Sequence, residues 1–188
     1  MSYSVLSPTV RLSATPLDRP AERFAGIVAF ALLTALAAFV RIPLPFTPVP
    51  VTLQTFVVLA AGIYLGGRDA AISQVGYLAL GAAGLPVFAG GAGVGHLFGA
   101  TAGYLLAFPL AAALVGASIR PGDSAARATA VFTAATALIL GTGAAWLSTF
   151  LGIGLERALA LGVLPFLPGA ALKIAAAVAL VVRAPLTR

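Results

Sequence analysis

Long apolar stretches alternate with short polar, glycine-rich or proline-rich segments along most of the chain. A helix needs about 17–25 mostly apolar residues to cross a lipid bilayer, and six stretches reach or approach that length. They are residues 24–42, 51–66, 69–85, 101–119, 128–152 and 164–183. Proline clusters and short charged turns such as "GGRD" and "RPGD" separate them, because proline and glycine interrupt helices. The pattern predicts an all-α integral membrane protein with six transmembrane helices.

The first 20 residues do not share this pattern. Serine, threonine and proline are scattered through them, and they lack the apolar core of roughly 7–15 residues that a secretory signal needs. We interpret residues 1–20 as a cytoplasmic N-terminal arm and residues 21–188 as a single six-helix membrane domain.

The composition supports a membrane protein. Hydrophobic residues make up 61% of the chain and charged residues only 9%, compared with about 25% charged residues in a typical soluble domain. The net charge of +6 is spread along the chain without a basic cluster, which does not favour nucleic-acid binding. Because the chain has no cysteine, a disulfide framework, a thiolate nucleophile and a cysteine metal site are excluded.

The distribution of arginine predicts the orientation of the helices, because basic residues favour the cytoplasmic side. With the N-terminus inside, only Arg41 and Arg157 fall in outer loops. The cytoplasmic segments then hold Arg11, Arg19, Arg23, Arg68, Arg120, Arg127, Arg183 and Arg188. We therefore expect both termini in the cytoplasm.

This orientation brings three unusual segments to the outer face: the proline-rich residues 43–50, the glycine-rich residues 86–100 and the approach to the last helix, residues 153–168. Non-helical backbone at membrane depth persists only where protein buries it or where it lines a cavity. A small-molecule pocket beneath the three segments is therefore favoured over simple turns. The glycines of residues 90–103 would let one segment pack closely over a ligand and move as a lid.

Groups for catalysis are scarce, so we do not expect an enzyme. Of the five carboxylates, Glu156 lies beside Arg157 in an outer loop, and the others lie near arginines in cytoplasmic segments: Asp18, Glu22, Asp69 and Asp123. They are interpreted as interfacial pairs or solvated charges. His96 has no evident partner for general-base work, no metal site is expected, and the chain carries no Walker-type ATP-binding loop.

Lys173 is the most informative residue. It lies about one turn inside the predicted last helix, and an ionisable side chain inside a span usually faces a cavity or a partner. A lysine that reaches back to the lipid headgroups is the alternative. No acid within the span is available to pair with it, whereas the carboxylate of a ligand is, so anion binding is favoured.

Several other residues give weaker indications of a binding site or of a contact between helices. Gln54, Thr101 and Tyr104 are polar residues that border the expected pocket, although each is also compatible with a structural role. The first helix carries small residues at four-residue spacing, which permit close approach of another helix. They are the pairs Ala25 with Ala29 and Ala31 with Ala35.

Four motifs together closely resemble the BioY family, the biotin-specific substrate-capture (S) components of energy-coupling-factor (ECF) transporters. They are "PLPFTPVPVTLQTF" at 43–56, "GLPVFAGGAG" at 84–93, "TAGYLLAF" at 101–108 and "LGVLPFLPG" at 161–169. The resemblance covers about residues 25–185. It implies the S-component fold, a multi-pass protein of a bacterial or archaeal plasma membrane, and biotin as the transported ligand, with no cofactor. It also implies assembly with a transmembrane coupling subunit and two ATPases, or a homo-oligomer if the protein acts alone.

The resemblance implies roles for individual residues. Lys173 matches the family lysine expected to meet the biotin carboxylate, and Tyr104 matches the tyrosine that opens the fourth helix. Phe88, Ala89, Gly90 and Gly91 match the segment expected to cover the ligand. Ala31 and Ala35 match the small residues that contact the coupling subunit, and we extend that expected surface to Ala25 and Ala29.

One position departs from the family pattern. The last helix usually begins G-D-x-x-K, whereas this chain reads Gly169-Ala170-Ala171-Leu172-Lys173. Ala170 removes an acid one turn before the lysine, on the same helix face. The alternatives to biotin capture are therefore an S component for a related or different vitamin and, less favoured, a membrane scaffold without a ligand.

Overall fold

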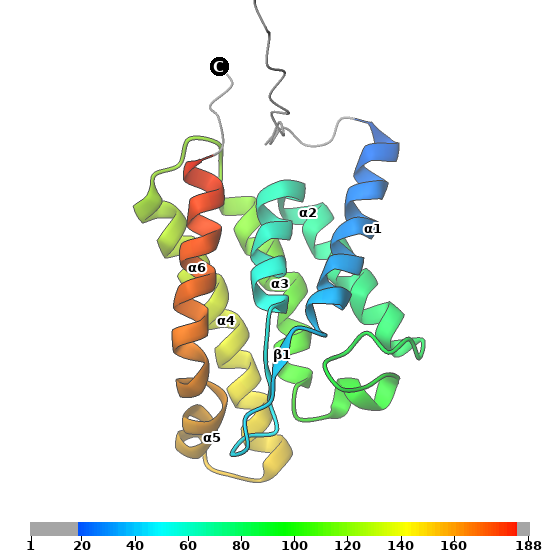
Figure 1. Ribbon diagram of the computed structural model, residues 1–188, viewed down its shortest axis with the longest axis vertical. Helices are drawn as coiled ribbons and strands as arrows, with labels where there is room; N and C mark the ends of the chain where they lie inside the picture. The colour runs from blue at the N-terminus through cyan, green and yellow to red at the C-terminus, as the bar shows by residue number, and fades with distance from the viewer. Residues whose placement is uncertain (1–18, 184–188) are drawn as a thin grey trace, which may run out of the picture.

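The computed structural model describes residues 19–183 and is predominantly helical (Figure 1). Its elements in chain order are α1 (Pro20–Ala37), β1 (Arg41–Ile42), β2 (Val51–Thr52), α2 (Gln54–Ala82), the 3-10 helix η1 (Val94–Phe98), α3 (Ala102–Ser118), α4 (Ala125–Leu151), α5 (Leu155–Gly162), the 3-10 helix η2 (Leu164–Phe166) and α6 (Leu167–Val182). Most of the expected N-terminal arm, with Arg11 and Asp18, and also Arg188 lie outside the described residues.

Four helical stretches of the described chain are long and apolar enough to cross a membrane. They are Pro20–Ala37, Gln54–Ala82, Ala125–Leu151 and Leu155–Val182, the last of which combines α5, η2 and α6. Helix α3 is apolar but shorter. The expectation of a mainly helical membrane protein is therefore confirmed, while the count of six crossings and the cytoplasmic placement of the termini stay predictions.

Helix α2 folds back on itself. Its backbone is non-helical at Gly66, where φ is 75° and ψ is 169°, so the interruption predicted at "GGRD" is confirmed. The amide nitrogen of Gln54 lies 2.6 Å from the hydroxyl oxygen of Tyr77, although 23 residues of unbroken helix would span about 35 Å. Residues 54–65 and 67–82 are therefore two antiparallel arms, which occupy the places of the expected helices 51–66 and 69–85 (Figure 1).

The fold-back packs directly on α3. A Cβ atom added to Gly116 of α3 would lie 2.4 Å from the carbonyl carbon of Gly66 and 2.4 Å from the nitrogen of Gly67. These neighbours are backbone atoms, which cannot move away as a flexible side chain can. Only glycine at position 116 therefore allows the two backbones to approach so closely.

The first helix ends earlier than the sequence pattern predicts. Helix α1 stops at Ala37, and residues 38–42 are not helical, which corrects the expected boundary at residue 42. The chain instead forms a short antiparallel ribbon in which Arg41 pairs with Thr52 and Ile42 with Val51. This ribbon brackets the proline-rich residues 43–50, whose fixed φ angles and missing N–H groups prevent the helix from continuing.

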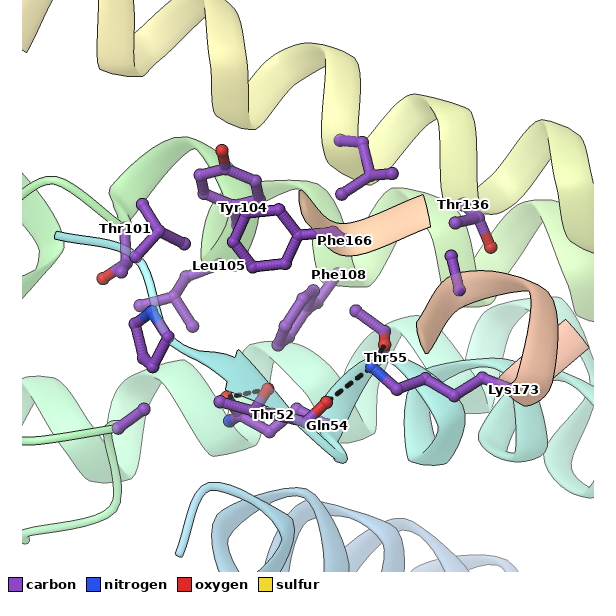
Figure 2. Close-up of a pocket in the computed structure, with 15 residues that line it drawn as sticks. Thr52, Gln54, Thr55, Thr101, Tyr104, Leu105, Phe108, Thr136, Phe166 and Lys173 are labelled. Atoms are coloured by element: carbon purple, nitrogen blue, oxygen red, sulfur yellow. Dashed lines mark hydrogen bonds between the residues drawn. The ribbon is translucent and has the colours of Figure 1, made fainter. Parts of the chain in front are cut away.

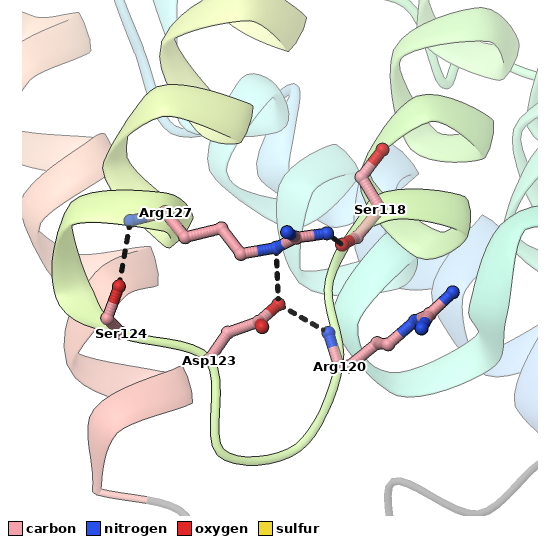
Figure 3. Close-up of polar contacts among 5 residues, drawn as sticks. All are labelled: Ser118, Arg120, Asp123, Ser124 and Arg127. Atoms are coloured by element: carbon pink, nitrogen blue, oxygen red, sulfur yellow. Dashed lines mark hydrogen bonds and ion pairs between the residues drawn. The ribbon is translucent and has the colours of Figure 1, made fainter.

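Ion pairs lie at turns and helix ends, as the sequence indicated. Arg23 of α1 donates two hydrogen bonds of 2.8 Å to the carboxylate of Asp69, which holds the fold-back of α2 near the beginning of α1. In the α3–α4 turn, Arg127 contacts Asp123 at 3.2 Å, and the Asp123 carboxylate also accepts the backbone N–H of Arg120 (Figure 3). Asp69 is buried, and Arg23 compensates its charge, whereas the Asp123 pair lies in an exposed turn.

The exposed surface carries large apolar side chains, as expected for helices that face lipid. Phe24, Leu36 and Leu172 are more than 60% exposed. A soluble monomer rarely leaves such apolar surface uncovered. The buried core is rich in alanine, which lets the helices pack closely around a few large side chains such as Tyr77 and Phe132.

Substitution of Gly116 by alanine tests the contact between α3 and the α2 fold-back. We expect the free energy of unfolding to fall by about 1–3 kcal/mol, because the added methyl group forces the two backbones apart. Unfolding of the purified protein in mixed detergent micelles measures this change. Gly141→Ala in α4 is the matched control, because its added Cβ has no neighbour within 4 Å. An equal response of the two variants would contradict the close contact.

Candidate functional site

A cavity is lined by residues of the ribbon, the glycine-rich loop, α3, α4 and α6. It has about 620 Å³ of space unfilled by atoms, part of it open to solvent. All three segments expected to converge contribute to its wall, through Pro50, Ala89 and Phe166. The lining residues are Val49, Pro50, Thr52, Gln54, Thr55, Ala89, Thr101, Tyr104, Leu105, Phe108, Thr136, Leu140, Phe166, Ala170 and Lys173 (Figure 2).

The wall combines one cation with aromatic, aliphatic and hydroxyl groups. Lys173 is the only charged side chain among these lining residues. Leu105, Phe108 and Phe166 supply apolar surface, and several threonines supply hydroxyl groups. Small-molecule sites are commonly apolar with a few polar groups that fix orientation. The cavity therefore suits a largely apolar ligand with a negative charge.

The ammonium group of Lys173 is held by neutral oxygens. It donates to the backbone carbonyl of Thr52 at 2.6 Å and to the hydroxyl of Thr55 at 2.9 Å (Figure 2). None of the ion pairs among the described residues includes Lys173. Because an ammonium group has three N–H donors, one donor remains for another acceptor at the cavity. Ala170, one turn earlier on α6, lines the same cavity without offering an acid.

Gln54 lines the cavity, but its amide group is hydrogen-bonded to other residues of the protein. It is 2% exposed, and its amide nitrogen donates to the hydroxyl of Tyr77 and, at 3.3 Å, to the carbonyl of Thr34. Its amide oxygen accepts the hydroxyl of Thr52 at 3.3 Å. The Tyr77 hydroxyl in turn donates to the carbonyl of Val87 at 3.3 Å. Gln54 therefore joins α1, the ribbon and the glycine-rich loop.

Tyr104 and Thr101 lie where α3 begins, and both line the cavity. The hydroxyl of Tyr104 donates to the carbonyl of Gly162 at 2.8 Å, so it points toward α5 and away from the cavity (Figure 2). The ring centroids of Tyr104 and Phe166 are 6.3 Å apart. Tyr104 therefore offers the face of its ring rather than its hydroxyl.

The loop residues expected to cover the ligand divide into two groups. Ala89 lines the cavity, whereas Phe88, Gly90 and Gly91 do not. Phe88 is 3% exposed and makes an edge-to-face contact with Tyr77, with ring centroids 5.6 Å apart. It anchors the loop on α2 and thereby positions Ala89. A direct contact between a ligand and the other three residues stays a prediction.

The four small residues of α1 differ in their exposure. Ala31 and Ala35 are each 5% exposed and belong to the buried core, whereas Ala25 and Ala29 are exposed. In this conformation, a partner subunit therefore reaches Ala25 and Ala29 but not the other pair. The coupling-subunit contact stays a prediction for all four positions.

Several lining residues were not singled out from the sequence. Thr52, Thr55 and Phe166 lie inside motifs that the sequence displayed, so their positions carried a signal. Phe108 likewise ends the motif at 101–108, whereas Thr136 comes from the middle of α4, where only the packing of the helices shows that it faces the cavity.

Comparison with known proteins identifies the family. The family model described as "BioY family" matches residues 9–187. The chain belongs to the BioY family. It is 37% identical over 159 residues to a protein of Pyrococcus horikoshii named "Probable biotin transporter BioY", an alignment that covers 84% of this chain and 93% of that protein.

A further relative and a solved structure support the assignment. A "Probable biotin transporter BioY" of Lysinibacillus sphaericus is 49% identical over 90 residues, which is 48% of this chain and 45% of that protein. The fold is similar to a crystal structure of the S-component for biotin from an ECF-type ABC transporter, with a TM-score of 0.79 and 29% identity. The superposition covers 87% of this chain and 90% of the other.

His96 makes an aromatic contact within the glycine-rich loop. Its ring stacks on Phe88, with centroids 5.2 Å apart, and its Nε2 atom is buried without a hydrogen-bond partner among the described residues. Burial lowers the pKa of His96 below its usual value of about 6.5. The neutral ring fits this place, whereas a protonated ring would bury an unpaired N–H.

We therefore expect the loop to loosen as the pH falls through about 6.5, because the open loop binds a proton more readily than the packed one. Hydrogen exchange of peptides from residues 84–101, corrected for the intrinsic pH dependence of exchange, measures this loosening. His96→Phe keeps the stacked ring and should remove the pH dependence. The same pH dependence in both proteins would contradict a role for His96.

Proposed function

We propose that this protein captures biotin at the cavity of Lys173 and takes it up as the S component of an ECF-type transporter. The observation that supports this most is a lysine at a largely apolar cavity, hydrogen-bonded only to neutral oxygens, in a member of the BioY family. The carboxylate of a ligand supplies the missing counter-charge.

The chemistry of biotin suits the groups around the cavity. Its carboxylate is an acceptor for the free N–H of Lys173, in a charge-assisted hydrogen bond that is stronger than a neutral one. Its alkyl chain and fused rings are largely apolar and match Leu105, Phe108 and Phe166. Its cyclic urea needs both donors and acceptors, and the hydroxyl of Thr101, at the end of the cavity opposite Lys173, is both (Figure 2).

Ala170 supports a second candidate, an S component for a biotin-like ligand or for a different small vitamin. The alanine lines the cavity at the place where the BioY pattern has an acid, so the site lacks one hydrogen-bond acceptor. A ligand with fewer N–H donors than biotin loses less binding free energy when that acceptor is missing. Direct competition among biotin, desthiobiotin, thiamine and riboflavin separates this candidate from biotin capture.

The proposed setting is the plasma membrane of a bacterium or archaeon, with six crossings and both termini in the cytoplasm. The two antiparallel arms of α2 allow six crossings from a chain with fewer separate long helices. The arginine distribution favours this orientation, with the ribbon end of the bundle outside. A transmembrane coupling subunit and two ATPases would complete the transporter, and the exposed Ala25 and Ala29 belong to the surface we assign to that contact.

Lys173→Met tests the function, since it removes the charge and keeps the length of the stem. We expect biotin to bind roughly 10- to 100-fold more weakly, the loss of one hydrogen bond to a charged group. Biotin amide, which is uncharged, should lose clearly less affinity than biotin, because its amide oxygen accepts only a weaker hydrogen bond from the lysine. Equilibrium binding of the labelled ligands to purified protein gives the four affinities.

Two further variants sharpen this measurement. Arg157→Gln removes an exposed cation that does not line the cavity and should leave the affinity for biotin unchanged. Ala170→Asp restores the family acid and should tighten biotin binding. An equal loss of biotin and biotin amide in Lys173→Met would show a structural role for the lysine, and saturable binding of neither ligand by any variant would refute biotin capture.

A further inference from the structure

A second hollow adjoins the cavity of Lys173. It has about 600 Å³ of unfilled space, part of it open to solvent, and Arg41 is the charged residue in its wall. Its lining residues are Arg41, Pro43, Leu44, Thr47, Pro48, Pro50 and Ala89. Pro50 and Ala89 also line the cavity of Lys173, so the two hollows meet at this pair of residues. Neither the function proposed above nor the sequence motifs assign a role to Arg41.

Arg41 is exposed and forms no ion pair with any residue that the structure describes. Its guanidinium lies against the glycine-rich loop: a Cβ atom added to Gly90 would lie 2.7 Å from Nη1 of Arg41. Gly90 has a φ of +104°, which favours glycine, so both the space and the backbone at this position suit glycine. The loop therefore holds the arginine at the shared wall beside Ala89.

The ribbon fixes Arg41 relative to Lys173. Arg41 pairs with Thr52 across the two strands, and the carbonyl of Thr52 accepts the hydrogen bond from the Lys173 ammonium. A short piece of hydrogen-bonded backbone thus connects the two cations. Pro50 and Ala89 form a wall common to both hollows, so an anion at Arg41 lies next to the cavity in which Lys173 lies.

We propose that Arg41 and the outer hollow form an entrance subsite for the carboxylate of an incoming ligand, occupied before the carboxylate reaches Lys173. This inference rests on the proposed function, since it takes a biotin-like carboxylate as the ligand. Arginine presents a planar set of donors that matches a carboxylate. Because Arg41 is exposed, it acts mainly on the rate of association, as charges at the rim of a binding site commonly do.

Association kinetics of labelled biotin with the purified protein in a non-ionic detergent test this subsite. We expect Arg41→Gln to lower the association rate constant by about 3- to 10-fold at low ionic strength, with little change in the dissociation rate constant. The difference should shrink as salt screens the charge. Arg41→Lys should retain most of the wild-type rate.

Two controls separate steering of the ligand from other roles of the arginine. Arg157→Gln removes another exposed cation away from both hollows and should leave the association rate of biotin unchanged. Biotin amide should associate at the same rate with wild type and Arg41→Gln. A similar slowing for biotin and its amide would assign Arg41 a structural role in the loop and overturn the proposal.

The remaining outcomes are also decisive. Unchanged association of biotin with Arg41→Gln, while the wild type binds biotin normally, would overturn the entrance subsite alone. Arg41 would then contact water or the phosphate of a lipid headgroup instead. An absence of biotin binding by the wild type would overturn the proposed function and the entrance subsite together, so the two failures are distinguishable.

Discussion

The ammonium group of Lys173 is the constraint around which the ribbon end of the bundle is arranged. A charge taken out of water costs free energy unless hydrogen bonds or an opposite charge compensate it. Here the carbonyl of Thr52 and the hydroxyl of Thr55 supply two hydrogen bonds, and no described acid pairs with the lysine. The compensation is therefore incomplete without an opposite charge, which under the proposed function is the carboxylate of the ligand.

Thr52 connects the ribbon to α2 and α6 through its backbone and its side chain. Its backbone pairs with Arg41, its carbonyl accepts from Lys173, and its hydroxyl donates to Gln54. From Gln54 the hydrogen bonds continue to Tyr77 and on to the glycine-rich loop at Val87. Hydrogen bonds therefore connect Lys173 to the glycine-rich loop. A change in the position of the lysine would reach that loop through them. The buried ring of Phe88 packs that loop against Tyr77 of α2.

Hydropathy predicted most of the helices, because the lipid phase requires long apolar stretches and proline or glycine marks their ends. The interruption at Gly66 was visible in "GGRD", and the importance of Lys173 was visible as a lone cation in a span. The two-residue strands were not predictable, because such short strands have no periodic pattern of their own. Helix α5 was likewise expected only as part of an irregular approach to the last helix.

The direction of individual side chains was the least predictable feature of the site. Phe88 lies in a motif associated with ligand coverage but points into the protein, and Ala31 and Ala35 pack in the core while Ala25 and Ala29 are exposed. Phe108 and Thr136 reach the cavity only through the packing of α3 and α4. Small residues and aromatic rings serve packing and binding equally well, so their roles depend on the three-dimensional contacts.

Lys173 is the only lysine in the chain, which permits a direct test of the central claim. Lysine labelled with ¹⁵N at the side-chain nitrogen places a single label at the cavity, and biotin carrying ¹³C in its carboxyl group places the other. A dipolar-coupling measurement by solid-state NMR in lipid membranes then reports the distance between the two nuclei. The account predicts about 4 Å or less, the separation of an ion pair. Bound biotin without measurable coupling to this nitrogen would contradict it.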